Sequence, residues 1–309
     1  MLLKTYSIIL FCLIPGLLTG CRLPGVLHVS RLDIGRSRDL MLEAASAQER
    51  NDLETAETKL AKAVKINEND GDIRSKYAEV LWQHGKKQEA VEQLLIAVKK
   101  FPNDARLFLL LSEQCYEIGN IEMSQVYAGE AIKKSTQENK SMIHRAWTIL
   151  ARIQYRQGHY KNSLASYHKA LMFSPQNPEL LSELAALYES MNHPDRALVS
   201  WQKASHLYQL SQPDSEPEQI FLGQGNAYMA MGRYHEAAEQ FLAAQQRWPN
   251  DTRIYCRLAQ AKLALGEIAE ARQLTEQAMA LAPQDRQILD LKNRVELAQL
   301  AQTQNPPVR

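Results

Sequence analysis

Seven stretches of this chain share one internal register, and successive copies begin 34 residues apart except across two short insertions. The copies begin at Ser37, Gly71, Ala105, His144, Pro178, Glu218 and Thr252. A fixed period of this length predicts one supersecondary unit stacked many times, because each unit buries its apolar face only against its neighbours. This register constrains the fold more than any single residue does.

Three positions of the unit accept few residue types. Position 15 is glycine or asparagine in Asn51, Gly85, Gly119, Gly158, Asn192, Gly232 and Gly266. Position 20 is small in Ala56, Ala90, Ser124, Ser163, Ala197, Ala237 and Ala271, and position 27 is always alanine in Ala63, Ala97, Ala131, Ala170, Ala204, Ala244 and Ala278. Glycine and asparagine adopt the left-handed backbone that ends a helix at little cost. The pattern predicts two closely packed helices per unit, joined by a tight turn.

Four copies close with a proline at position 32, which cannot continue a helix. These prolines are Pro102, Pro175, Pro249 and Pro283. The complete pattern resembles the tetratricopeptide repeat (TPR), most clearly in Trp147, Leu150, Ala151, Tyr160, Tyr167, Ala170 and Pro175, and in Gly225, Tyr228, Tyr234, Ala237, Phe241, Ala244 and Pro249. The resemblance implies an all-α, right-handed superhelix of seven repeats over residues 37–284, a capping helix at 285–302 and a tail at 303–309.

The N-terminus has a second informative pattern. An apolar stretch from Ile8 to Leu18 is too short to span a bilayer comfortably. It ends in Leu18-Thr19-Gly20-Cys21, which resembles a bacterial lipobox. That resemblance implies a lipoprotein signal peptide at residues 1–20, acyl chains such as palmitate on Cys21, and a lipidated N-terminus and linker at residues 21–36. An uncleaved anchor and an ordinary secretory signal cut elsewhere remain alternatives.

The resemblance to lipoproteins also implies a location in the cell envelope. Residue 22 is arginine rather than the aspartate that marks inner-membrane retention in many enteric bacteria. This favours the periplasmic side of the outer membrane over the inner membrane.

Charge and motif content point away from several classes of function. Lys4 is the only charged residue among the first twenty, so its removal leaves 35 basic against 35 acidic side chains. A balanced chain has no electrostatic footprint for nucleic acid. The eight histidines never fall in a paired metal-binding spacing, and Gly223 and Gly225 are better explained by close helix packing than by a phosphate loop. We therefore expect no enzyme activity, cofactor, metal or small-molecule substrate.

The remaining candidate is a concave surface. In the TPR family the first helix of each repeat lines the groove, with positions 2, 5, 6, 9, 12 and 13 facing inward. The candidate partner-binding residues are Arg145, Arg152, Tyr155 and Arg156, followed by Asn226, Arg253 and Arg257. Arginines beside an aromatic ring offer bidentate and stacking contacts to acidic or carboxylate groups of a peptide. Alternatively the groove charges neutralise one another, with Glu113 and Glu117 against Arg152 and Arg156.

The two resemblances together imply a function in binding. The first hypothesis is a membrane-anchored scaffold that holds a protein or peptide partner during pilus, secretion or envelope assembly. The alternative is a non-catalytic accessory subunit that positions an enzyme of cell-wall or polysaccharide synthesis.

Overall fold

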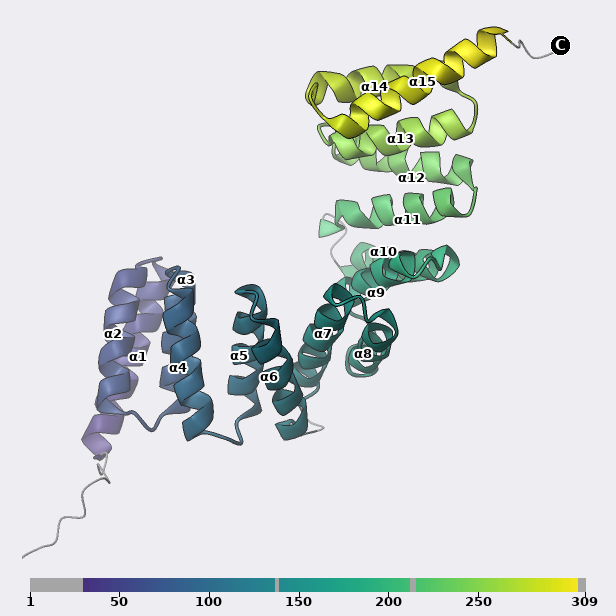
Figure 1. The fold of residues 1–309 in the computed structure, drawn as a ribbon. Coiled ribbons are helices and arrows are strands. Elements are labelled where there is room, and N and C mark those ends of the chain that lie inside the picture. The colour runs from purple at the N-terminus through teal and green to yellow at the C-terminus, as the bar shows by residue number, and fades with distance from the viewer. Residues whose placement is uncertain (1–29, 137–138, 212–214, 305–309) are drawn as a thin grey trace, which may run out of the picture.

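The computed structural model describes residues 30–136, 139–211 and 215–304, which form fifteen α-helices and no strand (Figure 1). The helices are α1 Arg31–Glu49, α2 Leu53–Ile66, α3 Gly71–Gln83, α4 Lys87–Lys100, α5 Ala105–Glu117, α6 Ile121–Lys134, α7 Lys140–Arg156, α8 Tyr160–Phe173, α9 Pro178–Ser190, α10 Pro194–Ser211, α11 Glu218–Ala230, α12 Tyr234–Arg247, α13 Thr252–Ala264, α14 Ile268–Leu281 and α15 Arg286–Gln304. The predicted all-α fold of paired helices is confirmed.

The turn inside each pair uses the position-15 residue as the register predicts. The glycines at this position have φ between 74° and 82°, and Asn51 and Asn192 have φ of 59° and 58°. Among the described residues, these two asparagines are the non-glycine residues with positive φ. Each turn therefore needs a residue for which the left-handed conformation is cheap.

The seam between paired helices is built from the small residues. Every alanine or serine at positions 20 and 27 is at most 1% exposed. Where serine replaces alanine, its hydroxyl bonds across the seam: Ser124 Oγ donates to the carbonyl of Ser112, and Ser163 Oγ donates to that of Ala151, both at 2.8 Å. These bonds satisfy hydroxyls that would otherwise be costly to bury.

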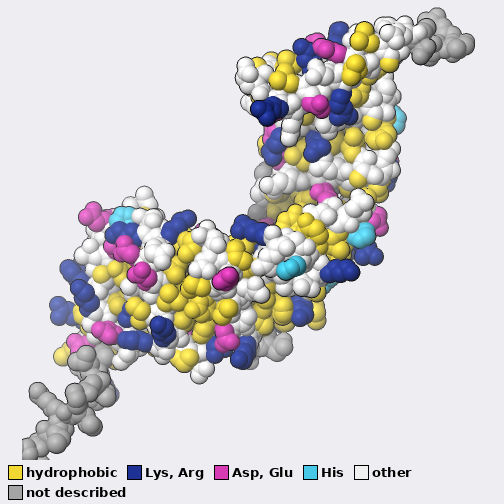
Figure 2. Space-filling model, in the orientation of Figure 1, with side chains coloured by type: hydrophobic (Ala, Val, Ile, Leu, Met, Phe, Trp, Pro, Cys, Tyr) yellow, Lys and Arg dark blue, Asp and Glu magenta, His cyan; other side chains and the backbone are white. Residues whose placement is uncertain are grey.

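The pairs stack in sequence order. Figure 1 shows helices α1–α6 in one arm and α11–α15 in another, with the array turning through α7–α10. First helices also contact first helices of adjacent pairs, as α5 does with α7 and α11 with α13. The odd-numbered helices thus form one layer along the array. Figure 2 shows the molecule hollowed between its two arms, with charges of both signs interspersed on this face.

Several helices extend beyond the limits that the repeat register suggests. Helix α1 begins at Arg31, so residues 31–36 are helical and do not belong to a linker over 21–36. The cause is a capping box: Ser30 Oγ accepts the N–H of Asp33 at 3.1 Å, and Asp33 Oδ2 accepts the N–H of Ser30 at 3.2 Å. Helix α7 starts at Lys140, before His144, and α15 runs on to Gln304.

The expected signal peptide, Cys21 and the last five residues lie outside the described residues. Within the described ranges, no helix combines the length and apolar character needed to cross a membrane.

Candidate functional site

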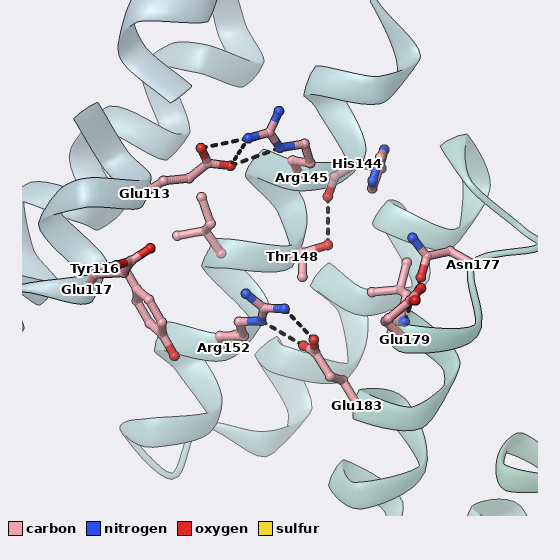
Figure 3. A pocket seen from close by; sticks show the side chains of 12 residues that line it. Glu113, Tyr116, Glu117, His144, Arg145, Thr148, Arg152, Asn177, Glu179 and Glu183 are labelled. Atoms are coloured by element: carbon pink, nitrogen blue, oxygen red, sulfur yellow. Dashed lines mark hydrogen bonds and ion pairs between the residues drawn. The ribbon is translucent and has the colours of Figure 1, made fainter. Parts of the chain in front are cut away.

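A pocket of about 470 Å³ opens between the first helices of three successive repeats, α5, α7 and α9 (Figure 3). Its lining residues are Glu113, Tyr116, Glu117, His144, Arg145, Thr148, Ile149, Arg152, Asn177, Glu179, Leu180 and Glu183. Most of them occupy positions 2, 5, 6, 9, 12 or 13 of their repeats, which share one helical stripe. The pocket is therefore part of the face that the odd-numbered helices present.

An arginine–glutamate pair ties α5 to α7 on one side of the pocket. Arg145 Nε donates to Glu113 Oε1 at 2.9 Å, and Nη2 donates to Oε2 at 2.7 Å. Burial raises the pKa of Glu113, and the nearby carboxylate of Glu117 adds to the rise, whereas Arg145 opposes it. The bidentate geometry holds both side chains in one orientation.

A second pair ties α7 to α9 (Figure 3). Arg152 donates to Glu183 through both Nε, at 2.8 Å, and Nη2. The hydroxyl of Tyr167 donates to the same carboxylate at 3.0 Å, and its ring is only 3% exposed. Hydrogen bonding to Glu183 raises the pKa of Arg152, and burial followed by the charge of Glu183 raises the pKa of Tyr167. A core aromatic residue of α8 thus orients a groove carboxylate.

The remaining two candidates of this region, Arg156 and Tyr155, lie in different surroundings. The guanidinium of Arg156 lies over the ring of Tyr116, 4.2 Å from its centroid, next to the pocket. Tyr155 is not among the lining residues; its hydroxyl lies 2.8 Å from Ser190 Oγ, and its ring is tilted against Tyr160. The structure brings Arg145 and Arg152 into one pocket, adds Arg156 at its edge and leaves Tyr155 outside.

Some of the groove charges neutralise one another, but with partners that differ from the predicted pairs. Arg152 was expected against Glu113 or Glu117 and instead pairs with Glu183 on the following repeat. Glu113 pairs with Arg145. Arg156 stacks on Tyr116 rather than pairing with a carboxylate. Long side chains at a repeat boundary can reach either neighbour, and the angle between repeats selects one.

The C-terminal candidates meet in a second pocket of about 640 Å³ between α11, α13 and α15. Asn226, Arg253 and Arg257 all line it, together with Leu222, Cys256, Gln260, Arg286, Gln287, Asp290 and Leu291. Arg253 is held by Asp251 and by Glu218, through Nη2–O distances of 2.6 and 2.7 Å. Arg257 contacts Gln260 at 3.3 Å. This pocket is richer in arginine and amide groups than the first.

Aromatic side chains behind the groove are residues that the sequence pattern did not connect with it. Trp201 Nε1 donates to Glu189 Oε1 at 2.9 Å, and Tyr208 donates to Glu179 Oε1 at 3.1 Å. Trp201 and Tyr208 are at most 7% exposed. Burial, then the charge of Glu179, raises the pKa of Tyr208 to about 12. Both aromatic rings pack in the core, and their polar tips reach groove carboxylates.

The arrangement suits binding. Over the described ranges, no group of three histidine, cysteine or acidic side chains could hold a metal ion. Cys115 is buried and Cys256 half-buried, and burial raises the pKa of both thiols, that of Cys115 to about 11. A thiol with a raised pKa is a poor nucleophile at neutral pH.

Family comparison agrees with the repeat register. Two models, both described as tetratricopeptide repeat, match the chain at residues 47–113 and 228–295 and at residues 144–177. Together the matches span more than half of the 309 residues. No curated protein matches the chain.

Solved structures share the fold at low identity. The chain is similar to pilF of Pseudomonas aeruginosa, with 15% identity and a TM-score of 0.61, over 75% of this chain and 99% of that one. It is similar to YrrB, described as a TPR protein with an unusual peptide-binding site, with 17% identity and a TM-score of 0.55, over 66% and 99%.

A third similar structure is the APC/C hetero-tetramer Cut9–Hcn1, with 15% identity and a TM-score of 0.60, over 85% of this chain and 53% of the matched chain. This chain therefore spans about half the length of that relative. At such identities the likeness shows the fold alone.

Proposed function

Because the chain belongs to the tetratricopeptide repeat family, we propose that it is a non-catalytic scaffold of the bacterial envelope that holds a protein or peptide partner in its groove. The observation that carries this proposal is the pocket between α5, α7 and α9. Its walls come from three repeats, and both arginines and two of its glutamates are fixed in bidentate pairs before any partner arrives. A preorganised surface loses less conformational entropy on binding.

A lipid on Cys21 would fix this scaffold to a membrane. The support is the sequence Leu18-Thr19-Gly20-Cys21 after a short apolar stretch. Each buried methylene of an acyl chain adds roughly 0.8 kcal/mol of membrane affinity, so two or three chains anchor a soluble array firmly. With Arg22 following the cysteine, we place the array on the periplasmic side of the outer membrane, where it would act in pilus, secretion or envelope assembly.

The anchor is tested by labelling cells with a fatty acid. Cys21→Ala should abolish label incorporation and leave the unprocessed precursor, because the thioether is the substrate of signal cleavage. Cys256→Ala is the matched control and should retain the label. Absence of label from the wild-type chain in a bacterial host would rule out the lipid anchor and would leave the groove proposal unaffected.

The groove is tested by site-specific photo-crosslinking in envelope membranes. A photoreactive residue at Thr148, which lines the pocket, should give one dominant crosslinked partner. The same residue at Val126 on α6, which is 61% exposed and outside this pocket, is the control and should not. Equal products at both positions, or none at Thr148, would contradict a groove partner. Recovery of a cell-wall or polysaccharide synthase would favour the accessory-subunit alternative.

A further inference from the structure

The charges of the pocket between α5, α7 and α9 do not balance. Its lining contains four carboxylates and two guanidiniums. The two ion pairs occupy both arginines and only two of the glutamates. Within the described residues, Glu117 and Glu179 have no cationic partner, and even Arg156 at the pocket edge leaves the carboxylates in excess. Apart from Arg156, whose guanidinium lies on the Tyr116 ring, the charged groups still open to a partner are therefore acidic.

The two unneutralised carboxylates lie on opposite sides of the pocket. Figure 3 shows Glu117 beside Tyr116 on one side and Glu179 beside Asn177 on the other, with Arg152 between them turned toward Glu183. Ile149 and Leu180 supply apolar lining, and both side chains are buried. A side chain with an apolar stem and a cationic head matches this combination.

The neighbouring pockets lack this excess of negative charge. The pocket shared by α1, α3, α5 and α7 has three acidic and three basic lining side chains. There, Lys76 pairs with Glu79, Arg106 with Asp72, and Arg145 with Glu113. The pocket between α11, α13 and α15 has three arginines against one aspartate. The acidic excess is thus local to one segment of the groove.

The high pKa of Glu113 agrees with this charge balance. Its carboxylate has a bidentate arginine partner, yet burial and the repulsion of Glu117 keep the pKa above its ordinary value. A cation entering the pocket would relieve that repulsion.

We propose that this pocket receives a lysine or arginine side chain of the bound peptide, attracted by the unneutralised carboxylates of Glu117 and Glu179. This inference rests on the proposed function, because it specifies the chemistry of the groove partner. It also reverses the preference for acidic groups that the arginine-rich sequence of α7 suggests. Arg145 and Arg152 shape the pocket, whereas the two free glutamates select its occupant.

The test uses the full-length protein purified in detergent and an array of random dodecapeptides that are N-terminally acetylated and C-terminally amidated. Blocked ends restrict any charge preference to side chains. The wild-type chain should retain peptides enriched at least about fivefold in lysine or arginine at one position. For a selected peptide, replacing that residue with norleucine should weaken binding by about tenfold, as measured by fluorescence anisotropy.

The decisive variant is Glu117→Gln combined with Glu179→Gln. Glutamine keeps an acceptor for Tyr208, so thermal unfolding should stay near the wild-type midpoint while affinity for the basic peptide falls about tenfold. The matched control is Glu92→Gln with Glu122→Gln, two exposed carboxylates on second helices, and it should bind normally. Glu117→Lys alone should shift the enrichment toward acidic peptides.

Each contrary result separates the two proposals. Retained peptides without a basic preference, or binding that survives the double glutamine variant, would overturn the basic subsite and leave the groove function standing. Failure to retain any peptide would overturn the basic subsite, and only a missing crosslink at Thr148 would also overturn the groove function.

Discussion

At the scale of single residues, two glycines in the middle of α11 lie directly against aromatic rings of neighbouring helices, which leave no room for a Cβ atom. A Cβ built on Gly223 would lie 2.2 Å from Trp201 Cε2, and one on Gly225 would lie 2.3 Å from Phe241 Cε1. Both contacts are far below van der Waals distance, and the rings are at most 5% exposed, so they cannot easily move. Glycine is needed at both positions, despite its entropic cost in a helix, because the backbone of α11 approaches these rings closely.

Gly225→Ala should therefore lower the free energy of unfolding by about 1–3 kcal/mol through overpacking. Gly129→Ala is the control: Gly129 is an exposed interior residue of α6 with nothing within 4 Å of its Cβ, so alanine should stabilise the chain by roughly 0.5–1 kcal/mol. Urea titration followed by circular dichroism compares the two. Equal stability of the Gly225→Ala variant and the wild type would contradict the packing argument.

Glu189 offers a residue-scale test with pH. Burial raises its pKa, although the Trp201 N–H and Arg257 favour the charge. A raised folded-state pKa means that the folded chain binds the proton more tightly, so this carboxyl costs stability as pH rises above its unfolded pKa. Glu189→Gln should be more stable than wild type at pH 7.5, with the difference vanishing toward acid.

The measurement is urea unfolding at steps between pH 7.5 and 4.5. Glu92→Gln, at an exposed carboxyl on α4, is the matched control for removing one negative charge. A destabilised Glu189→Gln at neutral pH would show that the ionised form is needed for its bond to Trp201.

At the scale of helices, the arginine–glutamate pairs join first helices of adjacent repeats. Arg145–Glu113 joins α5 to α7, and Arg152–Glu183 joins α7 to α9. Both pairs are bidentate, unlike the pair of Lys76 and Glu79 within one turn of α3, and Arg152–Glu183 is also less exposed than that pair. They fix the relative orientation of repeats at the pocket.

A double-mutant cycle on Arg152→Met and Glu183→Gln should give a coupling energy of about 0.5–1 kcal/mol, toward the upper end of the range for exposed pairs because the geometry is bidentate. The same cycle on Lys76 and Glu79 should give no more than about 0.5 kcal/mol. Chemical denaturation of the four chains of each cycle supplies the numbers. A coupling energy for Arg152–Glu183 no larger than that for Lys76–Glu79 would show that the pair orients the two repeats without adding stability.

The elements themselves could be predicted because their causes are local. A glycine or asparagine needed for positive φ, and an alanine needed in a seam, repeat with the period of the unit, as Gly158 and Ala170 show. The partner of Arg152 has no such signal. Carboxylates on both adjacent repeats lie within reach, and the choice depends on the angle between repeats.

The sequence predicted a groove along the first helices, but not which of its charges remain free to contact a ligand. Arg145, Glu183 and Arg152, at positions 2, 6 and 9 of their repeats, line one pocket. What counts for a ligand is the charge that remains after internal pairing, and that depends on contacts between repeats. The arginines that dominate the sequence of α7 are occupied, so Glu117 and Glu179 become the open groups.

At the scale of the whole molecule, the array is held together mainly by contacts between helices close in sequence. Its apolar core is divided into clusters along the chain rather than gathered in one centre. Stability in such an array is nearly a sum of repeat and interface terms. Damage at one end should therefore fade within a repeat or two.

Deleting α15 tests this expectation. Ile288, Leu291 and Val295 are each 1% exposed, and the last two pack on Ala259 and Ala271 of the last repeat. Full burial of an aliphatic side chain contributes about 1.5–3 kcal/mol, so a chain ending at residue 285 should lose several kcal/mol of local stability. Hydrogen exchange should quicken in α13 and α14 while protection in α1–α6 stays unchanged. A chain ending at residue 304 is the control and should exchange like the full-length protein. Uniform loss of protection along all the helices would instead show one cooperative unit, and would mean that partner binding in the middle of the groove can influence both ends of the array.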